Sequence, residues 1–192
     1  MTRRLCKDSA TGEVILAKDV DSVRLYPDSI AEFVMKNGDV RCSVPQYQVG
    51  EVVAIAQSYQ EAINEFNRLG DISGWGNLIA NTENGCAGYY NKMFVKADLM
   101  PHRIRITDIK AERLQDISDE DCLKEGIFQW RDMEDCPKNS SEVMKSRYGF
   151  YGVWYSYGTP REAFAALIDK VSGRGTWDSN PYCFCYEFKL VK

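Results

Sequence analysis

The sequence predicts an α+β fold, namely a mixed or antiparallel β-barrel with helices at its periphery. Three observations support this class. Segments with strand patterns dominate the chain, only two or three segments carry helical signals, and strands and helices do not alternate regularly, as a doubly wound fold would require. The 192 residues are enough for one domain with a substantial core, so we expect a single domain spanning residues 1–192.

The first quarter of the chain has the pattern of short strands. Residues 30–44, "IAEFVMKNGDVRCSV", predict a hairpin whose turn is Asn37-Gly38, and we expect both turn residues to have positive φ angles. Residues 47–59, "YQVGEVVAIAQSY", predict a largely buried strand that ends at Tyr59.

A short helix and a long loop are expected next. Residues 60–70, "QEAINEFNRLG", have apolar side chains at helical spacing, and Gly70 is expected to end the helix. The following segment, near residues 70–92, is rich in Gly and Asn and predicts a loop insertion. Such a loop is either functional or a plain surface excursion.

The second half of the chain alternates between clear signals and a second loop. Residues 102–114 predict a strand, and residues 116–127 predict a short helix capped by Ser118. A loop insertion is expected near residues 131–158. Residues 159–173, "TPREAFAALIDKVSG", predict a complete helix with a buried stripe of Phe164, Leu167, Ile168 and Val171.

The chain closes with "YCFCYEFKLV", which predicts a central strand with Cys183 and Cys185 buried on one side. The seven cysteines are an odd number, and their spacing fits neither a disulfide framework nor a zinc site. We therefore expect reduced thiols, no metal and no cofactor.

The first residues, "MTRRLCK", do not continue into an apolar run, and no segment is long and apolar enough for a transmembrane helix. This predicts a cytoplasmic protein with no membrane partner. The net charge of −4 argues against bulk binding to duplex DNA but is compatible with a local basic groove.

Familiar catalytic arrangements are missing from the sequence. A Ser-His-Asp triad would have to use the single histidine, His102, and no nucleophile motif accompanies it. What remains is a set of cations and aromatic residues, which is typical of sites for single-stranded nucleic acid or a lone base. The alternative is an ordinary solvated strand face with aromatic residues in the core.

Two stretches of the chain are distinctive: "RLQDISDEDCLKEGI" and, near the end, the pattern W-D-S-N-P-Y-x-F-x-Y-E-F. With the order of the other segments, they resemble the ASCH domain family of the PUA-like superfamily, in its phage- and prophage-associated bacterial branch, and the similarity covers almost the whole chain. It implies one PUA-like β-barrel domain. "TRR" resembles the end of a family motif, G-x-K-x-x-T-x-R, whose glycine and lysine would precede Met1, so either the recorded start is late or the first strand and helix are lost.

The resemblance also implies a choice between binding and catalysis. Some family members are amidohydrolases that use a Lys-Thr-Glu set on N4-acetylated cytidine. Here the lysine is absent before Met1, Gln57 occupies the place of the glutamate, and only Thr2 matches. Because an amide cannot act as a general acid or base, we expect a non-catalytic protein that binds RNA or a nucleoside-type ligand.

Two alternatives stay open. The first is a hydrolase acting on an N4-acylated cytidine-type nucleoside, with Thr2 as its catalytic residue, and the second is a phage-derived structural or interaction protein. In the binding interpretation Gln57 meets a base edge, Tyr59 stacks on a base, and Trp177 and Asn180 chiefly shape the loop before the last strand. The predicted ligand-contacting residues are Thr2, Arg3, Arg4, Gln57, Tyr59, His102, Arg103, Arg105, Trp177 and Asn180.

Overall fold

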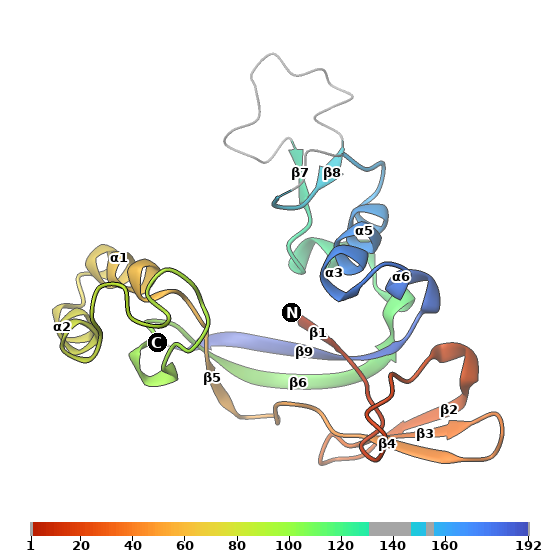
Figure 1. Cartoon of the computed structure of the whole chain (residues 1–192). Coiled ribbons are helices and arrows are strands. Elements are labelled where there is room, and N and C mark those ends of the chain that lie inside the picture. Colours follow the sequence, from red (N-terminus) through yellow and green to blue (C-terminus); the bar gives the residue numbers. More distant parts are fainter. Residues whose placement is uncertain (1, 131–146, 153–155, 192) are drawn as a thin grey trace. The chain divides into compact units, whose positions relative to one another are not determined.

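The computed structural model describes residues 2–130, 147–152 and 156–191 (Figure 1). Most of the predicted loop at 131–158 lies outside these residues. The chain divides into two compact units: unit 1 comprises Met1–Gln46 and Ile109–Glu187, and unit 2 comprises Tyr47–Asp108 and Phe188–Lys192. Each is described by itself below.

Helices and antiparallel strands together confirm the α+β class. The described strands are β1 (Thr2–Leu5), β2 (Val20–Leu25), β3 (Ala31–Met35), β4 (Val40–Ser43), β5 (Val52–Ala54), β6 (Arg103–Arg113), β7 (Phe128–Gln129), β8 (Tyr148–Gly149) and β9 (Tyr182–Val191). The described helices are α1 (Tyr59–Leu69), α2 (Ile72–Asn81), α3 (Asp119–Lys124), α5 (Pro160–Ser172) and α6 (Thr176–Ser179). The strand orders within the sheets are β1-β9-β6-β5, β2-β3-β4 and β7-β8.

Strand β9 confirms the prediction of a central strand, because it lies between β1 and β6 in the sheet. Its first five residues, Tyr182 to Tyr186, are all buried. On one face Cys183 and Cys185 pack in a core with residues of α3 and α5. On the other face the ring of Tyr182 meets Phe33 of β3 in an edge-to-face contact, with centroids 5.0 Å apart.

The two capped helices of unit 1 form where the sequence predicts them. Ser118 accepts a hydrogen bond from the amide of Asp121 at the start of α3, and Thr159 accepts one from Glu162 at the start of α5. The predicted buried stripe of α5 is wrong at its end: Val171 is 66% exposed, one turn beyond the half-buried Leu167 and Ile168.

The hairpin of β3 and β4 is confirmed, with Val34 opposite Val40. The prediction for its turn is wrong in part, because only Gly38 has a positive φ, at 88°. Asn37 instead uses its side chain, whose Oδ1 accepts a hydrogen bond from the amide of Asp39 at 3.0 Å. Such a side-chain bond stabilises a turn without placing Asn in the left-handed region.

In unit 2 the predicted buried strand over residues 47–59 is wrong. Only Val52–Ala54 form a strand, β5, and Val52 is exposed. Ser58 caps α1 in a full capping box with Glu61, so Tyr59 becomes the first residue of a helix rather than the last of a strand. Gly70 ends α1 in the left-handed conformation, as predicted.

The predicted loop near residues 70–92 is also wrong in its first half, because α2 occupies Ile72–Asn81. Asp71 caps this helix by accepting a hydrogen bond from the amide of Gly74 at 2.8 Å. Two glycines inside the segment lower its helix propensity, and burial of Leu78 against α1 compensates for them. The irregular segment therefore begins only after α2.

The burial of the cysteines leads to a first prediction. We expect a short pulse of iodoacetamide to label the exposed Cys42 rapidly and Cys6, Cys122, Cys183 and Cys185 slowly, because these four thiols are buried. Burial also raises the pKa of Cys122 to about 11, which removes the reactive thiolate at neutral pH. Peptide mapping by mass spectrometry reads out each site, and labelling of Cys183 and Cys185 as fast as Cys42 would contradict the placement of β9.

Candidate nucleic-acid interface

The segment that follows α2 in unit 2 is held at two points by one buried residue, through its backbone amide and its side-chain hydroxyl. Tyr59 donates its amide hydrogen to the carbonyl of Gly88 at 2.9 Å, and its hydroxyl accepts a hydrogen bond from the amide of Lys96 at 3.0 Å. Residues 89–96, which we call the aromatic loop, are thus fastened at both ends to the start of α1. A loop with fixed ends presents its side chains at lower entropic cost.

The inner side of the aromatic loop belongs to the core. Tyr89 and Val95 pack against the buried cluster that contains Tyr59 and Phe66. Gly88 has a φ of 88°, and a β-carbon there would lie 2.9 Å from Cγ1 of Val95. Glycine is therefore required where the loop leaves the core.

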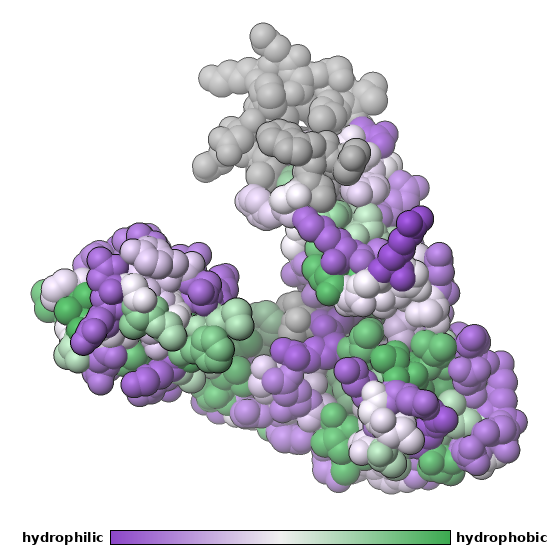
Figure 2. Space-filling model, viewed as in Figure 1, coloured by the Kyte–Doolittle hydropathy of each residue, from purple (hydrophilic) through white to green (hydrophobic). Residues whose placement is uncertain are grey.

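The outer side of the aromatic loop is exposed. The side chains of Tyr90 and Phe94 are 67% and 78% exposed, and Lys92 and Lys96 are exposed between and beside them. Phe94 has a φ of 64°, which is rare for a bulky residue and is often found at functional positions. Around α1 and α2, Figure 2 shows hydrophobic and hydrophilic residues mixed on the surface of unit 2.

Tyr90 is oriented by its neighbours. Its ring meets that of Tyr89 edge-to-face, with centroids 4.8 Å apart, and its hydroxyl donates to Oδ1 of Asn84 at 3.0 Å. These contacts leave most of the ring in solvent. The loop therefore carries two exposed aromatic rings and two exposed ammonium groups, a combination suited to stacking on bases and pairing with phosphates.

The prediction that Tyr59 stacks on a ligand is wrong. Its side chain is 3% exposed, and its hydroxyl is already bonded to the loop. Tyr59 is a positioning residue for Tyr90 and Phe94.

The other predicted residues of unit 2 lie at or before β6. Nε2 of His102 lies 2.6 Å from Oε1 of Glu65, so the imidazole is occupied by an internal contact. Arg103 and Arg105 are exposed on β6, where the guanidinium of Arg105 donates to the carbonyl of Gly50 at 3.3 Å. Gln57 is half-buried before α1, and its Oε1 is a buried acceptor with no partner among the described residues.

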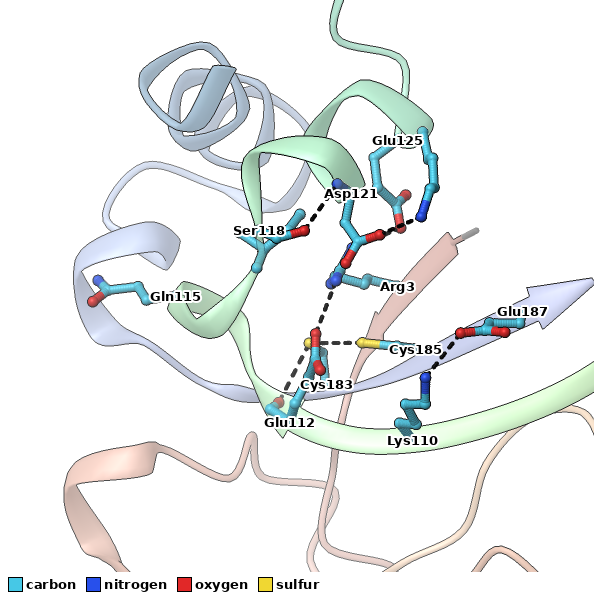
Figure 3. A network of polar contacts seen from close by, with 12 residues as sticks. Arg3, Lys110, Glu112, Gln115, Ser118, Asp121, Glu125, Cys183, Cys185 and Glu187 are labelled. Carbon is cyan, nitrogen blue, oxygen red and sulfur yellow. Dashed lines mark hydrogen bonds and ion pairs between the residues drawn. The ribbon is translucent and has the colours of Figure 1, made fainter. Parts of the chain in front are cut away.

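The prediction that Arg3 contacts a ligand is wrong, because its guanidinium is used inside unit 1. The Arg3 side chain is 4% exposed and donates to Glu112 at 2.8 Å and to Glu125 at 3.0 Å. Figure 3 shows this network between β1, β6 and the end of α3. A buried guanidinium needs such carboxylate partners. Its Nε is a buried donor without a hydrogen-bond partner among the described residues.

Thr2 and Arg4 also lie on β1, in unit 1, whereas Arg103 and Arg105 lie in unit 2. A groove formed by all four arginines is wrong as far as Arg3 is concerned and stays a prediction for the others. Arg4 is exposed and lines a groove of unit 1.

Trp177 and Asn180 have the structural role that the sequence indicates. Asn180 adopts a left-handed conformation at the end of α6, and its Oδ1 accepts a hydrogen bond from the amide of Gln115 at 2.9 Å. Trp177 packs edge-to-face on Phe164 and lies under the guanidinium of Arg161. Both residues fix the turn into β9.

The predicted ligand-contacting residues do not include Tyr90, Lys92, Phe94 and Lys96. The predicted loop ended near residue 92, within the segment "YYNKMFVK" of residues 89–96, so this segment was not considered as one unit. The alternation of aromatic and lysine residues in that segment is the signal that points to it.

No family model, curated protein or solved structure matches the chain. None of the helices among the described residues is long and apolar enough to cross a membrane. The same residues contain no group of three or more His, Cys, Asp or Glu side chains that could hold a metal ion.

The network around Arg3 gives a pH prediction. Burial raises the pKa of Glu125 from 4.5 to about 7, so the folded chain binds this proton more tightly than the unfolded chain. We therefore expect the contribution of Glu125 to the free energy of unfolding to be fully present below pH ~4.5 and to be lost as the pH rises through about 7. Urea unfolding between pH 4.5 and 8 measures this.

The variant Glu125→Gln should flatten the pH dependence in that window, because the amide does not titrate. Glu187→Gln is the matched control: the hydrogen bond from Lys110 lowers the pKa of Glu187, so this carboxylate does not titrate near pH 7, where Glu125 does. An unchanged slope in Glu125→Gln would show that this carboxyl titrates elsewhere.

Proposed function

We propose that this protein binds single-stranded RNA or a nucleobase-containing ligand through the aromatic loop of unit 2. The observation that carries the proposal is the pair of exposed rings, Tyr90 and Phe94, on a segment that Tyr59 fastens at both ends. Apolar ring surface exposed to water is unfavourable, so a partner that covers these two rings gains free energy of binding.

The ligand class follows from the chemistry of the loop. Every base has a π-face that can stack on Tyr90 or Phe94, and stacking contributes roughly 1–3 kcal/mol per base. Lys92 and Lys96 supply the positive charge that phosphates require. In a duplex the base faces are already stacked on each other, so single strands, loops or free nucleobases are the expected partners.

The net charge of −4 does not oppose this proposal, because recognition of a short single strand needs only local positive charge. Glu61, which lies near Lys92, restricts the number of phosphates that the loop can neutralise. Weak, salt-sensitive binding of a few nucleotides is the behaviour that this surface supports.

We also propose that the chain is an ASCH-type, PUA-like protein that binds its ligand without a catalytic step. What supports this is the resemblance of its segments together with β6, α3, α5 and β9 in the corresponding order. The amide of Gln57 stands where the hydrolases of that family have a carboxylate, so a binding role is preferred.

The stacking role predicts that Phe94→Ala and Tyr90→Ala each weaken binding of a fluorescein-labelled uridine-rich hexanucleotide about tenfold, since each change removes one stacking face. Fluorescence anisotropy at low salt measures the affinity. Tyr151→Ala is the matched control, because Tyr151 is 77% exposed in unit 1. If no variant differs from the parent, or if the parent does not bind, the proposal fails.

The phosphate role makes a separate prediction about salt. Each lost contact to a single-stranded phosphate should flatten the dependence of log K on log salt concentration by about 0.7. We therefore expect Lys92→Ala and Lys96→Ala to reduce this slope, whereas Lys36→Ala in the β3–β4 turn should leave it unchanged. A parental slope in both loop variants would contradict the placement of the RNA backbone.

A further inference from the structure

Strand β1 is an edge strand with an open side. Among the described residues it pairs only with β9, and it ends the sheet order β1-β9-β6-β5. The amide of Cys6, the residue after β1, donates to the carbonyl of Tyr182 in β9 at 2.8 Å, so the amide of Cys6 faces β9. Because backbone groups alternate along a strand, the amide and carbonyl of Arg4 also face β9, whereas those of Arg3 and Leu5 face away.

The next outward position confirms this alternation. The amide of Lys7 donates to Oγ of Ser43 in β4 at 3.1 Å, so it points away from β9. Arg3 and Leu5 therefore present a short row of backbone donors and acceptors to the open side. Such a row is a template for one more strand.

The open edge of β1 lines a groove. This groove belongs to unit 1 and has a volume of about 880 Å³, within the range of ligand sites. Its flanks are apolar: Ile168 and Val171 come from α5, and Val44 follows β4. Val171 and Val44 are 66% and 55% exposed, so both flanks are open to a partner.

The exposed charged side chains in the groove lining are cations. Arg4 and Lys7 are exposed cations in its lining. The acid in the lining, Asp8, is buried, and its carboxylate accepts hydrogen bonds from the hydroxyl of Thr11 at 2.8 Å and the amide of Ala10 at 3.3 Å. Arg3 adds no exposed charge, because both its carboxylate partners are internal.

We propose that this groove binds an extended acidic peptide segment of a partner protein, which adds to the open edge of β1 as a further strand. The peptide backbone pairs with the outward groups of Arg3 and Leu5, and its apolar side chains contact Val44 and Val171. Its carboxylates lie beside Lys7. This site is separate in residues and in ligand from the aromatic loop.

Charge also argues for a peptide over a second copy of this chain. Edge-to-edge pairing of two β1 strands would bring the cations of one copy close to those of the other, and facing like charges destabilise paired strands. An acidic segment instead complements the groove.

The test uses the full chain and a fluorescein-labelled peptide of alternating valine and glutamate. Anisotropy should show saturable binding, and hydrogen-exchange NMR should show that the peptide slows exchange at the amides of Arg3 and Leu5. Two probe controls are needed: the same peptide with alternate backbone nitrogens methylated, which cannot pair along one edge, and a peptide with lysine in place of glutamate. Neither control peptide should bind measurably.

The variant Lys7→Glu should weaken binding of the acidic peptide about fivefold and strengthen that of the lysine peptide, because it reverses one exposed charge. Lys36→Glu, in the β3–β4 turn, makes the same change outside the groove lining and should have no effect. Equal binding of the methylated peptide, no protection of the two amides, or self-association of the chain through this edge would each overturn the proposal.

Discussion

Burial of β9 on both faces is the constraint on which unit 1 depends. A strand with both faces in the core needs a covering layer on each side, and a backbone partner along each edge. The β2-β3-β4 sheet supplies one layer through the contact of Phe33 with Tyr182, and the core around α3 and α5 supplies the other around Cys183 and Cys185. Strands β1 and β6 supply the two edges.

This arrangement explains why Arg3 is paired with two carboxylates. Its position on β1 opposite Cys185 points the side chain to the covered face, where an isolated charge would be strongly unfavourable. Glu112 and Glu125 approach from two other elements and accept hydrogen bonds from the guanidinium. Burial of this network also raises the pKa of Glu125 to about 7, so its sensitivity to pH has the same cause, namely desolvation.

Sequence reasoning succeeded where local signals decide the structure. The caps at Ser118 and Thr159 and the left-handed Gly70 are local, and they placed α3, α5 and the end of α1 correctly. The central strand β9 was predictable because a continuous apolar run is typical of a strand that is buried on both faces. Tyr59 was assigned wrongly because apolar residues before it favoured a strand, whereas the capping box of Ser58 starts a helix.

The site was harder to predict, because exposure depends on tertiary contacts. Nothing local in the sequence distinguishes Arg3, which is buried with two carboxylates, from Arg4, which is exposed on the same strand. Likewise Tyr89 enters the core of unit 2 and Tyr90 leaves it, because Tyr59 fixes the path of the loop between Gly88 and Lys96.

The residues best placed to meet a partner are therefore not those that best fit a motif. Thr2 and Arg3 carry the resemblance to a family motif, yet Arg3 pairs with two carboxylates inside unit 1, and Tyr59 supports the loop. The groups left exposed are the rings of Tyr90 and Phe94 in one unit and the open backbone edge of β1 in the other. A stacking surface and a strand edge recognise different chemistry, since one needs π-faces and the other an extended backbone. The two proposals therefore rest on different residues, in unit 2 for the aromatic loop and in unit 1 for the strand edge.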